Sequence, residues 1–447
     1  MADDRPLTPA PLDASGTLLH QQTAQLRAHG PATRVTLPGN LTAWSVTRGD
    51  VLRRLLAHPH VARDARYNWP GYQPGTIPWL SPWIDVVSMS TTDGADHRRL
   101  RALVSQAFTP RRVESLQPHV HAVVTDLLDD LAGLPPHSII DLREHYCRRI
   151  PGQVICDLFG VHDHQRTRLL HALDTLPATA ENPELAANTF QEIYATLEDV
   201  IAAKKTAPGP DMTSALLAAH TENDDRLSHQ ELICTIFVMI GAGTDTVTSH
   251  LDHTVHALLT HPEQRAAALR DPGRWDDVIE ELLRLQGPIM HLPLRFVTAD
   301  IHLDEHTTLR TGDLLLPCFG AHGRDPEVHD RPDVFDINRP DKQHLAFGYG
   351  AHFCLGAHLA RIEAVIAMRD LFTRFPHLAL AAGPGGPDPV PSFIVNDYRA
   401  LPVVLGDAQP KTEVSAHAVV QPDGALTPGG SSAVKGGVMN QTQTRFS

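Results

Sequence analysis

The stretch "HLAFGYGAHFCLGAHLAR", residues 344–361, places Cys354 among three glycines, just before a helical pattern. Glycines at 348, 350 and 356 leave the backbone open to close approach by a bulky neighbour. A thiolate is both a nucleophile and a metal ligand, and the start of a helix favours it. A nucleophilic cysteine would need a paired base, and His352 is poorly placed for that role. A structural cysteine in a tight turn is the simpler alternative.

The composition of the whole chain is that of a folded, water-soluble protein. The chain has 447 residues, of which 42% are hydrophobic, and a formal net charge of −14, which argues against nucleic-acid binding. The five cysteines are widely spaced and form no C-x-x-C pair, as expected for a reducing compartment without a disulfide framework. We see neither a signal peptide nor a continuous run of about 18 apolar residues. We therefore expect a cytoplasmic protein that does not enter membranes.

Helical periodicity dominates the chain up to residue 286, which predicts a mainly α fold with a small β region. Alternating runs at 294–303 and 308–317 predict a small antiparallel sheet, and 388–405 alternates like a hairpin. Residues 65–94 predict a long loop. Residues 406–447 contain too little apolar surface to fold, so we expect a folded domain over 1–405 and a disordered tail over 406–447. The predicted helices cover 17–29, 48–58, 95–108, 113–131, 140–159, 163–173, 183–205, 211–220, 228–259, 262–270, 274–286 and 355–374.

The segment "FGYGAHFCLG", residues 347–356, matches F-G-x-G-x-H-x-C-x-G and resembles the haem-binding loop of the cytochrome P450 family. The resemblance implies that Cys354 is the axial iron ligand. It also implies that Phe347 packs beside the sulfur and that N–H groups of the loop donate to it. Gly348 and Gly356 would contact the cofactor, haem b, which the family holds between a long central helix and the cysteine loop.

The segment "VIEELLRL", residues 278–285, places Glu281 and Arg284 on one helix face, where they can pair. An ordinary surface ion pair is the alternative. In the family, this E-x-x-R pair is buried and is completed by a later arginine, which "FDINR" supplies as Arg339. The three residues would then hold the scaffold and take no part in chemistry. His329 departs from the family, where an aromatic residue is common at this position, and we expect little effect.

The segment "FVMIGAGTDTVTSHL", residues 237–251, carries two glycines inside a long apolar helix, each costing about 1 kcal/mol relative to alanine. Helix packing through small residues is one explanation. The run also resembles the family's A-G-x-[DE]-T signature, which places Ala242 and Gly243 against the haem. By the same resemblance, Asp245 and Thr246 relay protons during dioxygen activation. Thr246 can also hydrogen-bond back to a carbonyl and open the helix locally.

Four cationic or donor side chains match the family's haem-propionate contacts. In "DHRRLRALVSQAF", residues 96–108, the resemblance assigns His97 and Arg101 to this role and leaves Arg98 and Arg99 more exposed. Arg295, which lies eleven residues after Arg284, and His352, two residues before the cysteine, complete the set.

The substrate contacts follow the family only by position. The loop 67–90 would cap the pocket, and the long helix, the segment before Arg295 and the segment 392–395 would line it. His291 could bind a substrate oxygen or nitrogen, although a lone histidine more often only packs. The expected contacts are Val238, Gly241, Met290, His291, Leu292, Ile394 and Val395.

The resemblance spans roughly residues 15–405 and implies monooxygenation of an organic small molecule, by hydroxylation or epoxidation, typical of bacterial enzymes of secondary metabolism. Electrons from NAD(P)H would come through a separate ferredoxin or flavodoxin with its reductase. We expect the protein to be a monomer. Arg98, Arg99, Arg111 and Arg112 are candidate docking charges, with an ordinary solvated basic cluster as the alternative. Oxidative bond coupling without oxygen insertion, and a non-catalytic haem-thiolate sensor or scaffold, are the alternative functions.

Overall fold

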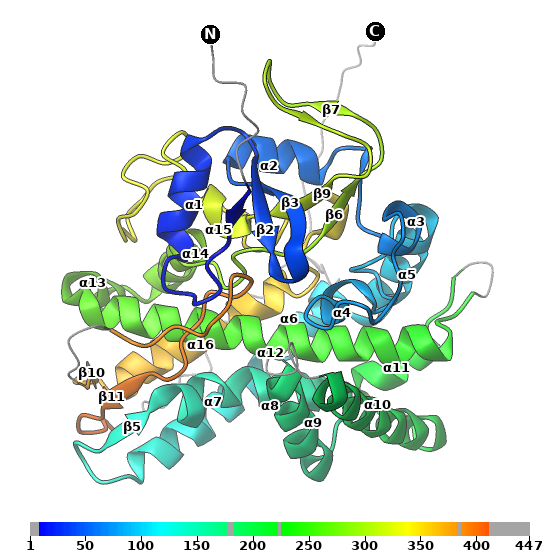
Figure 1. The fold of residues 1–447 in the computed structure, drawn as a ribbon. Helices are drawn as coiled ribbons and strands as arrows, with labels where there is room; N and C mark the ends of the chain where they lie inside the picture. The colour runs from blue at the N-terminus through cyan, green and yellow to red at the C-terminus, as the bar shows by residue number, and fades with distance from the viewer. Residues whose placement is uncertain (1–8, 177–182, 222–224, 382–385, 411–447) are drawn as a thin grey trace, which may run out of the picture. The chain divides into compact units, whose positions relative to one another are not determined.

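The computed structural model describes residues 9–176, 183–221, 225–381 and 386–410, and helices dominate its secondary structure (Figure 1). This arrangement agrees with the predicted mainly α class. The helices are α1 (Leu19–Ala28), α2 (Gly49–Leu56), α3 (Ala65–Asn68), α4 (Ser81–Ile84), α5 (Gly94–Ala107), α6 (Pro110–Glu114), α7 (Gln117–Ala132), α8 (Arg149–Phe159), α9 (Asp163–Thr175), α10 (Pro183–Thr206), α11 (Met212–Ala218), α12 (His229–Thr260), α13 (Pro262–Arg270), α14 (Trp275–Leu285), α15 (Phe319–His322) and α16 (Ala357–Arg374).

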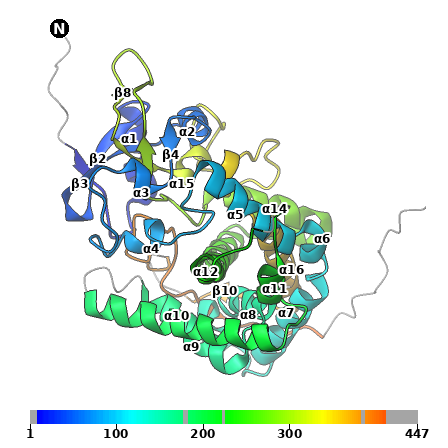
Figure 2. The same cartoon turned by 90° about the vertical axis from the view of Figure 1, so that its right-hand side faces the viewer.

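The long helix α12 forms the centre of the helical core. Ser228 caps it: the Ser228 hydroxyl accepts from the Glu231 N–H at 3.3 Å, and the Glu231 carboxylate accepts from the Ser228 N–H at 2.8 Å. Figure 2 looks along α12 and shows α8, α10, α14 and α16 around it, and each of these helices contacts it. By length and composition α12 could span a membrane, but most of it is buried inside the protein, as in the core helix of a soluble protein.

The largest sheet has six strands in the order β1-β2-β3-β9-β6-β4 and joins the N-terminal strands to the late ones. Its centre is mixed, because β9 pairs in parallel with β3 and antiparallel with β6. Arg295 opens β6 opposite Leu315, so this sheet fixes the backbone of a predicted site residue. The strands are β1 (Ala10–Pro11), β2 (Thr33–Leu37), β3 (Leu41–Val46), β4 (Val61–Ala62), β5 (Ile139–Asp141), β6 (Arg295–Val297), β7 (Ile301–His302), β8 (Thr308–Leu309), β9 (Leu314–Pro317), β10 (Ala379–Leu380) and β11 (Pro402–Val404).

Two predicted helices were wrong in part. The range 113–131 holds the end of α6 and most of α7, each with a proline in its first turn. The range 140–159 begins in β5, which pairs with β11, and continues through a short π-helical turn into α8. The predicted loop 65–94 includes the short helices α3 and α4.

The C-terminal prediction is confirmed in part. The hairpin is present as the antiparallel bridge Pro389↔Tyr398, but β11 pairs with β5 and β10 instead of with its own hairpin partner. The Gln409 N–H donates to the Arg374 carbonyl at 2.8 Å, so the chain after Leu405 remains in contact with α16 as far as Gln409. The remainder of the predicted tail, 411–447, lies outside the described residues.

Candidate functional site

The cysteine loop is a closed turn that leads into α16. The Cys354 N–H donates to the Phe347 carbonyl at 2.8 Å, and the Gly348 N–H donates to the Leu345 carbonyl at 2.8 Å. Gly348 and Gly350 both have φ of +73°, in the left-handed region that a side chain would strain. The glycines are therefore required by the turn that presents the cysteine.

Cys354 is the one exposed cysteine of the five, the others being buried. Partial enclosure by protein raises the pKa of the Cys354 thiol, while the N–H groups of Gly356 and Ala357 and the charge of Arg101 act in the opposite direction. The N–H groups at the helix start thus favour the thiolate, as predicted, but desolvation outweighs them and leaves the pKa raised. A metal cation would deprotonate the thiol directly.

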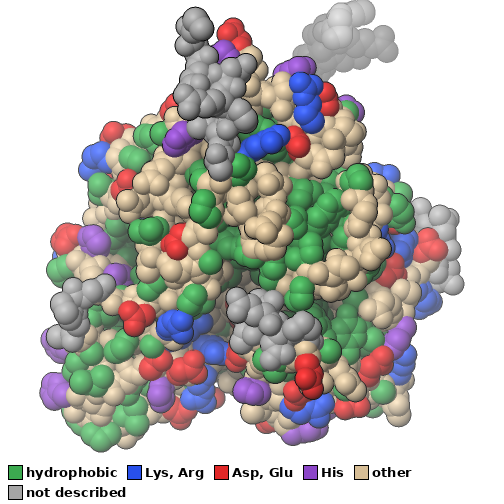
Figure 3. Space-filling view, viewed as in Figure 1, with side chains coloured by type: hydrophobic (Ala, Val, Ile, Leu, Met, Phe, Trp, Pro, Cys, Tyr) green, Lys and Arg blue, Asp and Glu red, His purple; other side chains and the backbone are tan. Residues whose placement is uncertain are grey.

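One face of α12 is open in the middle of an otherwise buried helix. Ala242 and Asp245 are exposed, and Val238 and Gly241 are partly exposed, at the spacing of a single helix face. Figure 3 shows apolar side chains gathered on the upper right of the molecule, over the loop that holds α3 and α4. An exposed stripe on a core helix indicates a cavity along this face.

Gly243 packs closely against the neighbouring helix α8. A Cβ at this position would lie 3.2 Å from Cδ1 of Ile155 on α8. Gly243 therefore permits close packing of α12 against α8, which was the alternative explanation for the small residues. Ala242 is the member of the pair that borders the open face.

Asp245 and Thr246 lie side by side on α12 with different chemistry. Desolvation raises the pKa of Asp245 to about 6, with Arg148 opposing the shift. Its side chain is accessible from the open face, yet protein surrounds the carboxyl, and this enclosure is the cause of the shift. The Thr246 hydroxyl donates to the Ala242 carbonyl at 2.7 Å, as predicted. The helix nevertheless runs unbroken from His229 to Thr260, so the expected local opening is absent there.

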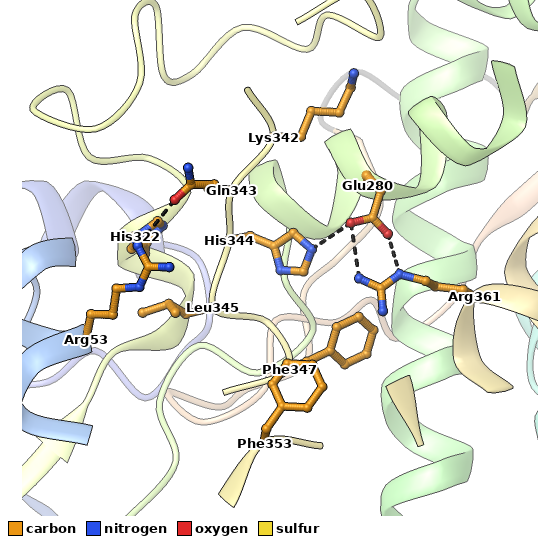
Figure 4. A pocket seen from close by; sticks show the side chains of 10 residues that line it. All are labelled: Arg53, Glu280, His322, Lys342, Gln343, His344, Leu345, Phe347, Phe353 and Arg361. Carbon is orange, nitrogen blue, oxygen red and sulfur yellow. Dashed lines mark hydrogen bonds and ion pairs between the residues drawn. The ribbon is translucent and has the colours of Figure 1, made fainter. Parts of the chain in front are cut away.

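Phe347 and Arg361 connect the cysteine loop with α12. Together with Thr246 and His250 they line a cavity of about 20 Å³. Phe347 and Arg361 also line a larger cavity of about 230 Å³, shown in Figure 4, where Phe347 and Phe353 form one wall. In that cavity Glu280 accepts from Arg361 Nη2 at 3.1 Å and lies 3.2 Å from His344 Nε2.

The four predicted propionate contacts lie around the start of β6, helix α5 and the cysteine loop. The rings of His97 and His352 are 4.5 Å apart between centroids, and both lie near positive charge, His97 near Arg101 and His352 near Arg295. Arg101 Nη2 donates to the Phe353 carbonyl at 2.9 Å, which ties α5 to the cysteine loop. Arg295 is 5% exposed, and its guanidinium donates to the Leu294 carbonyl at 3.3 Å.

Sequence reasoning missed two residues beside this group, Arg63 and Asp93. Asp93 Oδ2 accepts from the backbone N–H groups of Arg63 and Asp64, and Oδ1 lies 3.7 Å from His352 Nε2. Burial would raise the pKa of Asp93, but the His352 and backbone hydrogen bonds hold it below its ordinary value. The guanidinium of Arg63 is used by backbone carbonyls. No local motif identified Arg63, and Asp93 carried only the weak signal of an acid before a predicted helix.

The polar atoms of this region fit the carboxylates of a haem. Burial lowers the pKa of Arg295 to about 10 and that of His352 to about 4. His97 Nε2 and His352 Nδ1 are buried and have no hydrogen-bond partner within the described ranges. A buried cation and buried donors without acceptors are costly, and two propionates would satisfy them. With the exposed thiol and the open face of α12, the residues present fit haem b.

Glu281, Arg284 and Arg339 form a buried cluster. Glu281 accepts from Arg284 Nε and Nη2, both at 2.8 Å, and from Arg339 Nε at 3.2 Å. The side chains of Glu281 and Arg284 are 0% exposed. The cluster also holds the chain that follows α15, because Arg284 and Arg339 donate to carbonyls between residues 323 and 334.

The two predicted substrate segments lie side by side. The Met290 N–H donates to the Ile394 carbonyl at 2.8 Å, and Ile289 forms an antiparallel bridge with Val395. The His291 Nδ1–H donates to the Phe393 carbonyl at 2.6 Å, which leaves Nε2 as the acceptor. Met290, His291 and Ile394 are buried here, whereas Leu292 and Val395 are partly exposed.

Comparison with known proteins agrees with this geometry. The family model "Cytochrome P450" matches residues 171–270 and 275–389. A 2-hydroxy-5-methyl-1-naphthoate 7-hydroxylase of Streptomyces carzinostaticus is 40% identical over 89% of this chain and 98% of its own. The 6-deoxyerythronolide B hydroxylase of Saccharopolyspora erythraea is 33% identical over 81% and 88%. The structure of CYP154A1 from Streptomyces coelicolor covers 89% of this chain and 100% of its own at 41% identity, with a TM-score of 0.82.

The chain belongs to the cytochrome P450 family. It is a haem-thiolate monooxygenase of the soluble bacterial type, with haem b as cofactor and electrons from NAD(P)H delivered by redox partners. Because the naphthoate and 6-deoxyerythronolide B relatives are both hydroxylases, bond coupling and a sensor or scaffold role are not favoured.

Proposed function

We propose that this monooxygenase hydroxylates a largely apolar, ring-containing small molecule of secondary metabolism, similar in size to a substituted naphthoate. The support is the 40% identity, over nearly the full length, to a hydroxylase named for such a compound. The apolar side chains over α4 and the partly exposed Val238, Leu292 and Val395 agree with an apolar ligand. Epoxidation by the same site is the second expected reaction.

We assign the cofactor contacts as follows. Cys354 ligates the iron, and the loop residues Phe347, Gly348 and Gly356 surround the sulfur. Ala242, on the open face of α12, would contact the haem, while Gly243 contributes by close helix packing. When bound, the haem supplies the activation of dioxygen. The propionate contacts are His97, Arg101, Arg295 and His352.

Asp245 and Thr246 handle protons in this proposal. With a pKa of about 6, Asp245 can both hold and release a proton near neutral pH, which suits a relay. The Thr246 hydroxyl donates its hydrogen bond to the Ala242 carbonyl, so its oxygen remains free to accept a hydrogen bond from substrate or water. The exposed face at Asp245 gives both groups access to the cavity.

We further propose that a small acidic ferredoxin or flavodoxin, with its reductase, is the electron donor. Of the four candidate docking charges, Arg98 and Arg111 are exposed. Arg99 pairs with Glu231, and Arg112 donates to the carbonyls of residues 107, 210 and 211, so these two act within the fold. We also propose that the protein is a cytoplasmic monomer that binds neither nucleic acid nor membrane. Its folded domain, expected over 1–405 with a tail over 406–447, extends to Gln409 before the tail.

Screening by absorption spectroscopy tests the substrate proposal. Hydroxylated naphthoates and their saturated-ring analogues are titrated into the holoenzyme, and the spin-state shift of the Soret band is followed. We expect saturable shifts with the aromatic acids and oxygenated products when a ferredoxin system is added. Binding of long-chain aliphatic acids in preference to every ring compound would contradict the proposed substrate class.

A further inference from the structure

Arg63 is a buried arginine whose guanidinium donates four hydrogen bonds to backbone carbonyls. It directly follows β4 and is 3% exposed. Nε donates to the Ser90 carbonyl at 3.0 Å, and Nη2 donates to the Trp83 carbonyl at 2.9 Å. Nη1 donates to the carbonyls of Pro293 and Leu294 at 2.8 and 2.7 Å. A buried cation with neutral acceptors is an expensive arrangement, so its geometry needs a reason.

The four acceptors come from two segments that are distant in sequence. Trp83 and Ser90 lie in the loop 67–90, which we assign to the roof of the substrate pocket. Pro293 and Leu294 lie between His291 and Arg295, in the segment that connects the substrate wall to the propionate contacts. A single guanidinium therefore joins the roof of the pocket to its wall.

We propose that Arg63 is a positioning residue that clasps the loop 67–90 to the segment 290–295 and so sets the closed form of the substrate pocket. This inference rests on the proposed position of that loop over the substrate. Asp93 supports the clasp from the side, because it accepts the backbone N–H of Arg63 at 2.6 Å. Arg63 is distinct from the predicted propionate contacts, because four of its five N–H donors are taken by backbone carbonyls.

The shape of the side chain explains why arginine is required. The planar guanidinium presents five donors in a rigid fork, which can reach carbonyls on both sides at once. Lysine carries the same charge but places its donors at a single point, so it cannot bridge the same four acceptors. Arg63→Lys therefore separates the clasp from a simple need for positive charge, and Arg63→Met removes both.

The test measures two probe ligands on the holoenzyme, using the absorption shift on nitrogen ligation. Imidazole is the smaller probe, whereas 4-phenylimidazole carries a phenyl ring that would extend further into the pocket. We expect both variants to bind 4-phenylimidazole about tenfold or more weakly, the effect of losing one or two hydrogen bonds. Binding of imidazole, the haem content and the carbon monoxide Soret band should remain as in the wild type.

Two results would overturn the clasp. One is wild-type binding of 4-phenylimidazole by Arg63→Lys alongside weak binding by Arg63→Met, which would assign the role to charge. The other is unchanged binding in both variants. A wild-type protein that shows no shift with either probe would contradict the haem site itself, and this inference would fall with it.

Hydrogen exchange of the wild-type holoenzyme tests the clasp even if the variants do not fold. Amides of residues 84–92 and of residues 294–295 should open together, with protection factors that agree within about threefold, because one group holds both segments. The β7–β8 hairpin, Ile301–Leu309, lies outside the clasp and serves as the control. Opening of the two clasped segments at rates more than about tenfold apart would overturn the inference.

Discussion

Replacing Glu281 with glutamine should strongly destabilise the fold, because Glu281 neutralises two buried arginines. The substitution keeps the shape but removes the carboxylate that accepts from Arg284 Nε and Nη2 and from Arg339 Nε. It also weakens the acceptor of the Asp336 N–H, at 2.9 Å. Breaking a buried ion pair by removing one partner costs about 3–5 kcal/mol. A typical domain has a stability of about 5–15 kcal/mol, so a large share would be lost.

Urea unfolding followed by helical circular dichroism measures this loss, with the Soret band reporting haem release in the same samples. The matched control is Asp300→Asn, which removes a carboxylate from the exposed pair with Arg310, whose side chains are 44% and 65% exposed. An exposed pair contributes little to stability, because solvent screens its charges. The midpoint should fall clearly for Glu281→Gln and hardly for the control. Equal shifts in the two variants would refute the reasoning that the buried cluster holds the scaffold.

Three further predictions address the relay and the tail. Thr246→Ala should raise electron consumption per product severalfold while Thr246→Ser stays near wild type; unchanged coupling in a peroxide and product assay would show that the hydroxyl plays no part. Because its pKa is raised to about 6 from 3.8, Asp245 keeps its proton in the native state when the unfolded chain has lost it, so stability falls as pH rises through this window. In urea titrations at pH 4 and pH 7, the stability of Asp245→Asn relative to the wild type should therefore be higher at pH 7 than at pH 4. An equal difference between the two proteins at both pH values would contradict the shift. Deleting residues 410–447 should leave the haem content and the urea midpoint of unfolding unchanged. A decrease in either would show that these residues contribute to the stability of the folded domain.

Local patterns were sufficient for the helices but not for long-range pairing. The apolar periodicity predicted a helix over 228–259, which agrees closely with α12. The pairing of β5 with β11 joins residues about 260 positions apart, and no local signal in "SIIDL" distinguishes a strand from the start of a helix. Helical periodicity likewise continued across Ser115, where the structure has a break between the helices α6 and α7.

The candidate site shows the same division. Fixed-spacing motifs identified Cys354, the E-x-x-R pair and the acid–alcohol pair on α12. Arg63 and Asp93 escaped because their partners are mostly backbone groups brought together by folding, which leave no trace in side-chain spacing. Gly243 shows that a motif can also be incomplete. Its place in the motif does not reveal that it packs against Ile155 of α8.

The central claim, that Cys354 ligates a haem iron, is tested most directly by the absorption spectrum of the reduced protein under carbon monoxide. A thiolate ligand shifts the Soret band strongly to the red. We predict this band for the wild type and its absence in Cys354→Ser, with the exposed Cys354 being replaced at little cost to the fold. A histidine-type Soret band in the wild type, or a red-shifted band that survives in Cys354→Ser, would contradict the assignment.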